Sequence, residues 1–236
     1  MTINAKALLD RARRVIQDET SVRWPLAELR LWLNDSLREL ALYRPQAFSS
    51  SFPFALQVGT YQVIPDSYSQ LIRVPRNLKS LAESPRLPGP TIRTVDGDLL
   101  SAQSRDWNDP SITPASAIVR NVVFDISNPQ AFWVYPPNDG TGVAEIIAVK
   151  VPVGIASPSD PENITLYDID LDVIDIFGNA IVDYILYRAY SKDSQFSGSA
   201  QRAIACYQAF GNAIGVNIQN ANSINPNTET AGGNRA

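Results

Sequence analysis

The sequence predicts an α+β protein: a discontinuous antiparallel helical bundle with a large inserted antiparallel β module and an extended C-terminal tail. Apolar residues recur at helical spacing near both ends of the chain, and short β-prone segments with most of the 17 prolines lie between them. The last 21 residues are almost entirely polar. The expected parts are 1–50 (first half of the bundle), 51–160 (inserted β-rich module), 161–215 (second half of the bundle) and 216–236 (C-terminal arm).

Two amphipathic segments open the chain. Between Asn4 and Glu19 apolar residues recur at steps of three and four, which is typical of a helix with one buried stripe. Pro25 suits the first position of a second helix, because its missing N–H would have no partner there. That helix should end at Tyr43, since Pro45 disfavours helical geometry in the residue before it. The two segments together predict an αα-hairpin.

The middle of the chain is rich in β-branched and aromatic residues separated by turn formers. The expected strands lie in FPFALQV, TYQVI, AIVRNVVFDI, AFWVY and AEIIAVKVPV. Residues 132–135 and 145–149 alternate and are joined through PPNDGTGVA, so they predict a hairpin.

Helical spacing returns after Asn163. A helix over 168–190 is expected, with Asp168, Asp170, Asp172 and Asp175 in its first turns, where the helix dipole favours negative charge. The same acidic run resembles a calcium loop, but Val173 stands where that loop needs glycine. Helix capping is therefore favoured over metal binding. A last helix is expected over 197–214.

The composition removes several kinds of catalytic site. With no histidine, the chain lacks Ser-His-Asp and Cys-His catalysis and histidine-ligated zinc, and no P-loop or GxGxxG pattern occurs. The single Cys206 lies among helical apolar residues and is interpreted as a buried structural thiol. No catalytic, metal-binding or cofactor-binding residue is predicted. Two aspartate pairs near Trp107, 96 with 98 and 106 with 109, are interpreted as turn residues in preference to a glycosidase site.

Charge and hydropathy limit the partners. The formal net charge is −4, and the 20 lysines and arginines are scattered, so a dedicated DNA-binding face is not expected. No apolar run approaches the ~20 residues that cross a bilayer, and the N-terminus does not resemble a secretory signal. We expect a soluble protein with no membrane partner.

Two helical segments resemble the head-to-tail adaptor (connector) proteins of short-tailed, podovirus-like bacteriophages. The first is a W-x-x-x-E-L-x-x-W-L-N segment, and the second is a DY-x-L-Y-R-A-Y-S-K-D helix. The matching residues are Trp24, Glu28, Leu29, Trp32, Leu33 and Asn34, followed by Asp183, Tyr184, Leu186, Tyr187, Arg188, Tyr190, Lys192 and Asp193.

The resemblance implies a structural virion protein without enzymatic activity, made in the host cytoplasm. Such adaptors form a ring, usually of twelve copies, beneath the portal protein at the head-tail junction. The ring meets tail nozzle or tail fibre proteins, and DNA passes through its lumen without specific binding. The alternative is a carbohydrate-binding or tail-fibre-docking module, with or without weak hydrolase activity, built on the aromatic β segments.

Eight residues are predicted to contact a neighbouring subunit or the portal. Large side chains should anchor the contact, and arginines should pair with acidic residues of the neighbour and fix its register. The apolar residues of the tail 216–236 should dock on the portal. The predicted residues are Trp32, Tyr184 and Tyr187 as anchors, Arg30, Arg38 and Arg188 as ion-pair partners, and Ile218 and Ile224 in the tail. Ordinary packing within one subunit is the alternative for each anchor.

Overall fold

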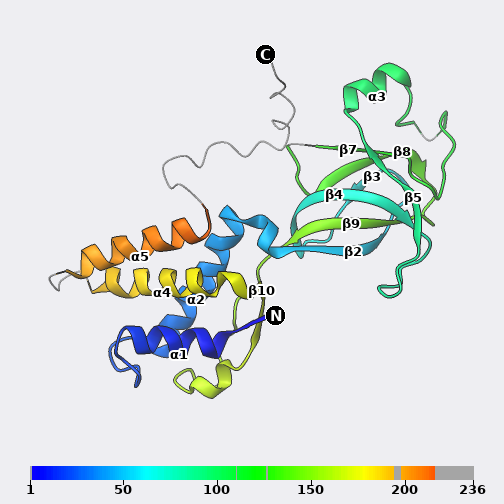
Figure 1. Cartoon of the computed structure of the whole chain (residues 1–236). Helices are drawn as coiled ribbons and strands as arrows, with labels where there is room; N and C mark the ends of the chain where they lie inside the picture. Colours follow the sequence, from blue (N-terminus) through cyan, green and yellow to red (C-terminus); the bar gives the residue numbers. More distant parts are fainter. Residues whose placement is uncertain (1, 110, 126, 194–197, 216–236) are drawn as a thin grey trace, which may run out of the picture. The chain divides into compact units, whose positions relative to one another are not determined.

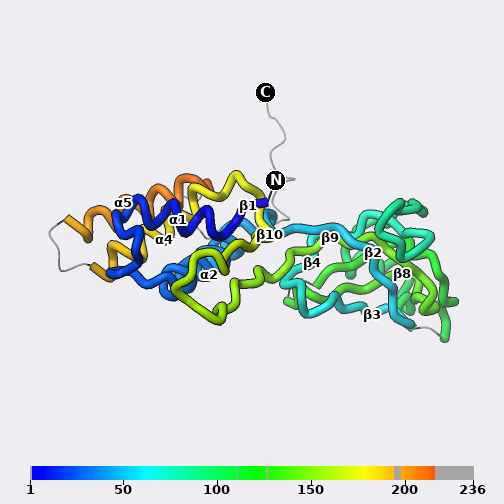
Figure 2. Tube along the Cα trace, turned by 90° about the horizontal axis from the view of Figure 1, so that it is seen from below, coloured from blue at the N-terminus to red at the C-terminus, as the bar shows by residue number. Residues whose placement is uncertain are grey.

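The computed structural model describes residues 2–109, 111–125, 127–193 and 198–215. It divides into two compact units, one formed by Met1–Ala47 with Pro152–Ala236 and the other by Phe48–Val151. We call them the helical unit and the β unit; Figures 1 and 2 trace the chain through both. The predicted α+β class is confirmed.

In the helical unit, α4 contacts each of the other three long helices. Leu9 of α1, Leu33 of α2, and Ile181 and Ile185 of α4 are fully buried. The elements are β1 (Thr2–Asn4), α1 (Ala5–Val15), α2 (Leu26–Tyr43), η1 (Pro45–Phe48, running to the unit boundary), η2 (Ile164–Tyr167), β10 (Asp170–Ile174), η3 (Asp175–Phe177), α4 (Gly178–Lys192) and α5 (Ser199–Ala213).

Side chains accept hydrogen bonds from backbone N–H groups in the first turns of α1 and α2. One of these side chains is close in sequence and the other is far away. Asn4 caps α1 by accepting a hydrogen bond from the Ala7 N–H at 3.3 Å. Pro25 precedes α2, and the carboxylate of Glu162 accepts from the Leu26 N–H at 3.0 Å. The second half of the helical unit therefore supplies a cap for the first half.

The helix predicted over 168–190 is wrong in its first ten residues, because α4 begins only at Gly178. Residues 170–174 form β10, which pairs antiparallel with β1. Leu171 and Val173 are buried while Asp170, Asp172 and Ile174 are exposed, so the segment follows the two-residue period of a strand. Asn4 donates to Asp168 at 2.8 Å and to Asp170 at 3.2 Å. These carboxylates bind the N-terminal strand and do not cap a helix.

The β unit consists of two four-stranded sheets with the orders β2-β9-β4-β5 and β3-β8-β7-β6. Side chains from both sheets, among them Leu71, Ile146, Val122 and Phe132, form one buried core. The elements are β2 (Ser49–Ala55), β3 (Gly59–Val63), β4 (Tyr68–Leu78), β5 (Pro88–Thr91), β6 (Arg93–Thr94), α3 (Gly97–Gln103), β7 (Asn121–Phe124), β8 (Ala131–Asn138) and β9 (Val143–Lys150).

Two expectations for the β module are wrong. The segments 132–135 and 145–149 do not form a hairpin, because β8 and β9 belong to different sheets and their connection crosses from one to the other. The module is also not wholly antiparallel, since the short strand β6 pairs with β7 in parallel.

A buried asparagine connects a strand of one sheet to the segment that leads into the other sheet. Asn77 in β4 donates from Nδ2 to the carbonyl of Val119 at 2.8 Å and to that of Pro90 at 3.0 Å. Its Oδ1 accepts from the Val119 N–H at 2.9 Å. All the polar atoms of this buried amide are paired, so it fixes the segment before β7 against β4.

Candidate assembly interface

The helices that carry the adaptor-like segments lie together in the helical unit. Glu28 near the start of α2 pairs with Lys192 at the end of α4, and Asp35 further along α2 lies 3.7 Å from Arg188. Because residue numbers rise along one helix as they fall along the other, α2 and α4 are antiparallel. Segments about 150 residues apart in sequence thus form one surface.

An aromatic cluster joins α4 to α5. The ring of Tyr184 meets Phe210 at 5.2 Å and Tyr187 at 5.7 Å, both edge-on, and Tyr187 meets Tyr207 at 4.7 Å. Edge-on rings at these distances attract each other in addition to the apolar area they bury. Burial, foremost, raises the pKa of the Tyr207 hydroxyl, with the Glu39 carboxylate of α2 adding to it. Tyr207 therefore stays a neutral donor to Glu39.

The asparagine of the W-L-N segment holds the chain where it returns from the β unit. Asn34 accepts a hydrogen bond from the Ile155 N–H at 2.8 Å and donates to the Ile155 carbonyl at 3.0 Å. Arg30 donates to the same carbonyl at 2.9 Å. A Cβ on Gly154 would lie 2.9 Å from Asn34 Cγ, so only glycine allows this close approach.

The turn between α1 and α2 is organised by Asp18. Its buried carboxylate accepts backbone hydrogen bonds from Val22, Arg23 and Trp24. Burial alone would raise the pKa of Asp18, but these three donors and the nearby Arg13 lower it below its usual value. The carboxylate is therefore held in its charged form.

Trp24 connects this turn to α4. Its indole N–H donates to the Ala189 carbonyl at 3.3 Å, and the Arg23 guanidinium lies 4.9 Å from the ring centre. Arg23 in turn pairs with Asp193 at the end of α4. Trp24 and Asp193 were not among the predicted contact residues. Both lie in the adaptor-like segments, and that position is the signal that could have identified them.

The family model described as SU10 adaptor protein matches residues 3–230, nearly the whole chain. The chain belongs to the SU10 adaptor protein family. The resemblance noted in the two helical segments is thereby confirmed. No curated protein matched the chain.

Membership identifies this adaptor as a structural protein of a bacteriophage. It implies a place in the virion and association with phage portal and tail proteins. Such adaptors are generally not enzymes. In the part of the adaptor that is described, no helix has the length and apolar character that crossing a bilayer requires.

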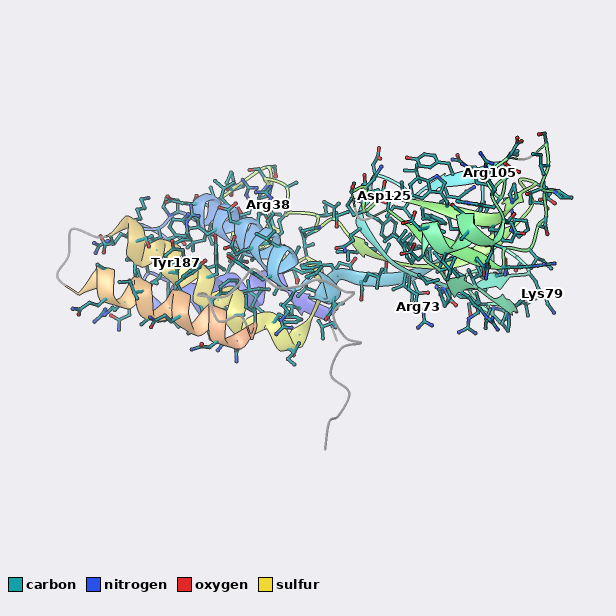
Figure 3. The ribbon with its side chains drawn as sticks, turned by 90° about the horizontal axis from the view of Figure 1, so that it is seen from above. Arg38, Arg73, Lys79, Arg105, Asp125 and Tyr187 are labelled. Carbon is teal, nitrogen blue, oxygen red and sulfur yellow. The ribbon has the colours of Figure 1, made fainter. Side chains whose placement is uncertain are left out.

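The structure places the predicted contact residues differently from one another. Trp32 and Tyr184 are buried in the helical unit, and Arg30 is bonded to Ile155. Three others lie at the surface of α2 and α4: Tyr187 is half-buried, and the side chains of Arg188 and Arg38 are 40% and 70% exposed. Figure 3 shows Arg38 on α2 and Tyr187 on α4.

Both surface arginines share one carboxylate, because Arg38 lies 3.1 Å from Asp35, which also faces Arg188. Arg38, Tyr187 and Arg188 are thus predicted contact residues that an isolated subunit leaves at least partly accessible. Ile218 and Ile224 lie outside the described residues. The contact role of all eight stays a prediction.

Two of the four aspartates considered for glycoside hydrolysis serve turns. Asp96 accepts from the Asp98 N–H at the start of α3, and Asp109 accepts from the hydroxyl and N–H of Ser111. The Ser111 hydrogen bonds lower the pKa of Asp109, whereas a general acid needs a raised one.

Among the described residues no group of three His, Cys, Asp or Glu side chains could hold a metal. Cys206 is only partly buried, and burial, with the nearby Asp183 adding to it, raises its thiol pKa.

Proposed function

We propose that this chain is the subunit of a head-to-tail adaptor ring, of twelve copies as the resemblance implies, that sits beneath the portal and joins the capsid to the tail. DNA leaves the capsid through the lumen of the ring without specific binding. The helical unit acts as a discontinuous bundle that holds the ring together, with the β unit as an insert facing tail nozzle or tail fibre proteins.

The observation that carries this proposal is that ion pairs and hydrogen bonds hold the two adaptor-like segments together in one folded body. Asp35 and Glu28 of α2 pair with Arg188 and Lys192 of α4, and Asn34 fixes the returning chain. A subunit of a ring that transmits force between capsid and tail needs such a body, because its lateral contacts keep register only if the surface does not deform.

Lateral contact is assigned to the accessible side of α2 and α4. Arg38, Arg188 and Tyr187 are exposed or half-buried there, and a neighbour's carboxylates would compete with Asp35 for the two guanidiniums. Charge pairs of this kind set orientation and register more than affinity. Trp32 and Tyr184 support this surface from beneath.

Portal contact is assigned to residues 216–236, with Ile218 and Ile224 as its apolar residues. The segment contains too few apolar residues to form a core by itself, so a partner surface is the natural place for it to be ordered. A chain ending at Gly215 should keep the melting temperature of the full chain and lose portal binding. Normal portal binding by the shortened chain would remove the segment from the proposal.

Electron microscopy tests the function as a whole. The full chain, alone at high concentration and mixed with portal rings, should yield rings on one face of the portal. A monomer that leaves portal rings bare at high concentration would contradict the adaptor assignment.

A second candidate is a carbohydrate-binding or fibre-docking module, and one observation favours it. Tyr61 is exposed and its ring lies 5.7 Å from that of Trp133, which forms an aromatic platform on the β unit. Size measurement separates the two, because a binding module remains a monomer in the presence of portal. Binding of surface polysaccharide that is lost in Tyr61→Ala would support the second candidate.

A further inference from the structure

The β unit has two outer faces, and one of them is positively charged. In the β2-β9-β4-β5 sheet, Arg73 lies opposite Ile147 and Arg76 opposite Glu145. The neighbouring residues of β9, Ala144, Ile146 and Ala148, belong to the core. Because side chains alternate along a strand, the two arginines point away from the core.

The loop between β4 and β5 carries Glu83, which pairs with Arg86 at 2.8 Å. The other acidic residue of this face, Glu145, is also neutralised. Arg76 lies 2.9 Å from its carboxylate and Arg86 lies 3.0 Å from it, and its side chain is only 15% exposed. Arg86 also donates to the Ser51 carbonyl at 2.7 Å, which fastens the loop between β4 and β5 across the sheet.

Two cations on the positive face remain available. Arg73 and Lys79 are exposed, and within the described part of the chain neither forms an ion pair. Figure 3 shows them on one side of the β unit, with Arg105 on the other. The fastened loop adds the exposed side chains of Leu81 and Leu87.

The opposite outer face is negatively charged. Helix α3 covers the outer side of the second sheet, where Leu100 and Trp107 pack on Val123. The segment around α3 carries four exposed aspartates against two exposed arginines, and none of the six forms an ion pair with a described residue. They are Asp96, Asp98, Asp106 and Asp109, with Arg93 and Arg105. Exposed Leu99 and Tyr61 lie on this side as well.

We infer that the positive face of one copy's β unit docks on the negative face of the next copy's β unit, an inference that rests on the proposed ring. Each face combines uncovered apolar side chains with charges that form no ion pair, positive on one face and mainly negative on the other. Two complementary faces on opposite sides of one body give a head-to-tail contact, which is the kind that closes into a ring. Like faces repel, so the charges also exclude back-to-back pairs.

Duplex DNA is the competing occupant of the positive face, since phosphates also attract arginine and lysine. The second copy is favoured because the same chain supplies the matching surface: the aspartates around α3 are exposed and form no ion pair with a described residue, and DNA binding leaves them unexplained.

Charge reversal on each face tests the inference. One variant carries Arg73→Glu with Lys79→Glu, and the other carries Asp98→Lys with Asp106→Lys. All four side chains are exposed and unpaired, so both variants should keep the melting temperature of the wild type. Asp66→Lys, in the exposed turn between β3 and β4, is the control and should assemble normally.

Each variant alone should need about tenfold or more protein for half-maximal ring formation on portal at low salt, because its two faces now carry the same sign. An equimolar mixture should recover assembly in alternating rings, since the reversed faces of the two variants carry opposite charge and meet each other, as do their two unreversed faces. In wild-type rings of ¹⁴N- and ¹⁵N-labelled copies, a carbodiimide should link Lys79 to an aspartate of the segment around α3 on another copy.

If the wild-type protein forms rings and both variants assemble equally well, the inference is wrong, whereas the adaptor function stands. Wild-type protein that forms no ring on portal would overturn both. If Arg73→Glu with Lys79→Glu abolishes the shift of a short DNA duplex and leaves assembly unchanged, the positive face belongs to DNA and the inference is wrong.

Discussion

The side-chain amide of Asn34 in α2 forms two hydrogen bonds with the backbone of Ile155, 121 residues later in the chain. The contact fixes the point at which the chain re-enters the helical unit. Since Asn34 is buried, the Ile155 N–H would lose its partner with no water to replace it if the amide were removed, whereas the Ile155 carbonyl would keep its hydrogen bond from Arg30.

Asn34→Leu should therefore lower the free energy of unfolding by about 1–3 kcal/mol, from one unsatisfied buried N–H. Urea unfolding followed by circular dichroism measures the loss. Asn212→Ala on the exposed side of α5 is the matched control and should change stability by less than about 0.5 kcal/mol. Equal stabilities for the two variants would show that Asn34 does not fasten the returning chain.

Local periodicity was enough to predict α1, α2 and α5, because each buries one stripe of its own residues. It failed at residues 170–174, where the letters DLDVI fit the start of an acidic helix and also fit a strand. The deciding partner is β1, and Thr2 and Asp170 are 168 positions apart. No local rule contains that information.

The same limit explains the wrong hairpin. Asn138, Asp139 and Gly140 form a turn, as their composition predicts, but a turn does not specify which strands pair beyond it. Pairing of β9 with β2 and β4 depends on contacts across the β unit. At the candidate interface, the sequence alone identified Arg38 and Arg188 as residues that can form ion pairs. The burial of Trp32 and Tyr184 could not be predicted in this way, because it depends on which helices meet.

Replacing Asp18 should change stability in a pH-dependent way. Its pKa is lower in the folded chain than in the unfolded chain, so the unfolded state binds the proton more readily. The stability that it contributes is full well above pH ~3.9, the ordinary carboxyl value, and is lost as the pH falls through that value and the lower folded pKa.

Asp18→Asn should thus cost about 1–3 kcal/mol near neutral pH, because an amide cannot accept from all three backbone donors, and the difference from wild type should shrink below pH 4. Thermal unfolding between pH 3 and 7 measures it. Glu19→Gln, an exposed neighbour, serves as the control and should be unchanged throughout. A difference that stays constant with pH would rule out the titration of Asp18 as its source.

Truncating the aromatic cluster should destabilise the helical unit. Tyr184→Ala removes a buried ring that contacts both Tyr187 and Phe210, so the free energy of unfolding should fall by about 3–5 kcal/mol. Tyr184→Phe keeps the ring and should cost about 1 kcal/mol or less. Tyr190→Ala, where the ring contacts Arg202 at 5.9 Å, should also cost about 1 kcal/mol or less. Similar losses in all three would contradict a cluster centred on Tyr184.

Reversing one surface charge should separate assembly from folding. Arg38 has a 70% exposed side chain and shares Asp35 with Arg188, so Arg38→Glu removes little from the folded subunit. On the proposed lateral surface the new carboxylate would repel a neighbour's acidic residues, and ring formation on portal should slow by about tenfold at low salt and less at high salt. Arg14→Glu, at an exposed position of α1, is the matched control and should assemble at the wild-type rate. Light scattering during mixing with portal measures both rates, and equal slowing in the two variants would mean that net charge, and not this surface, controls assembly.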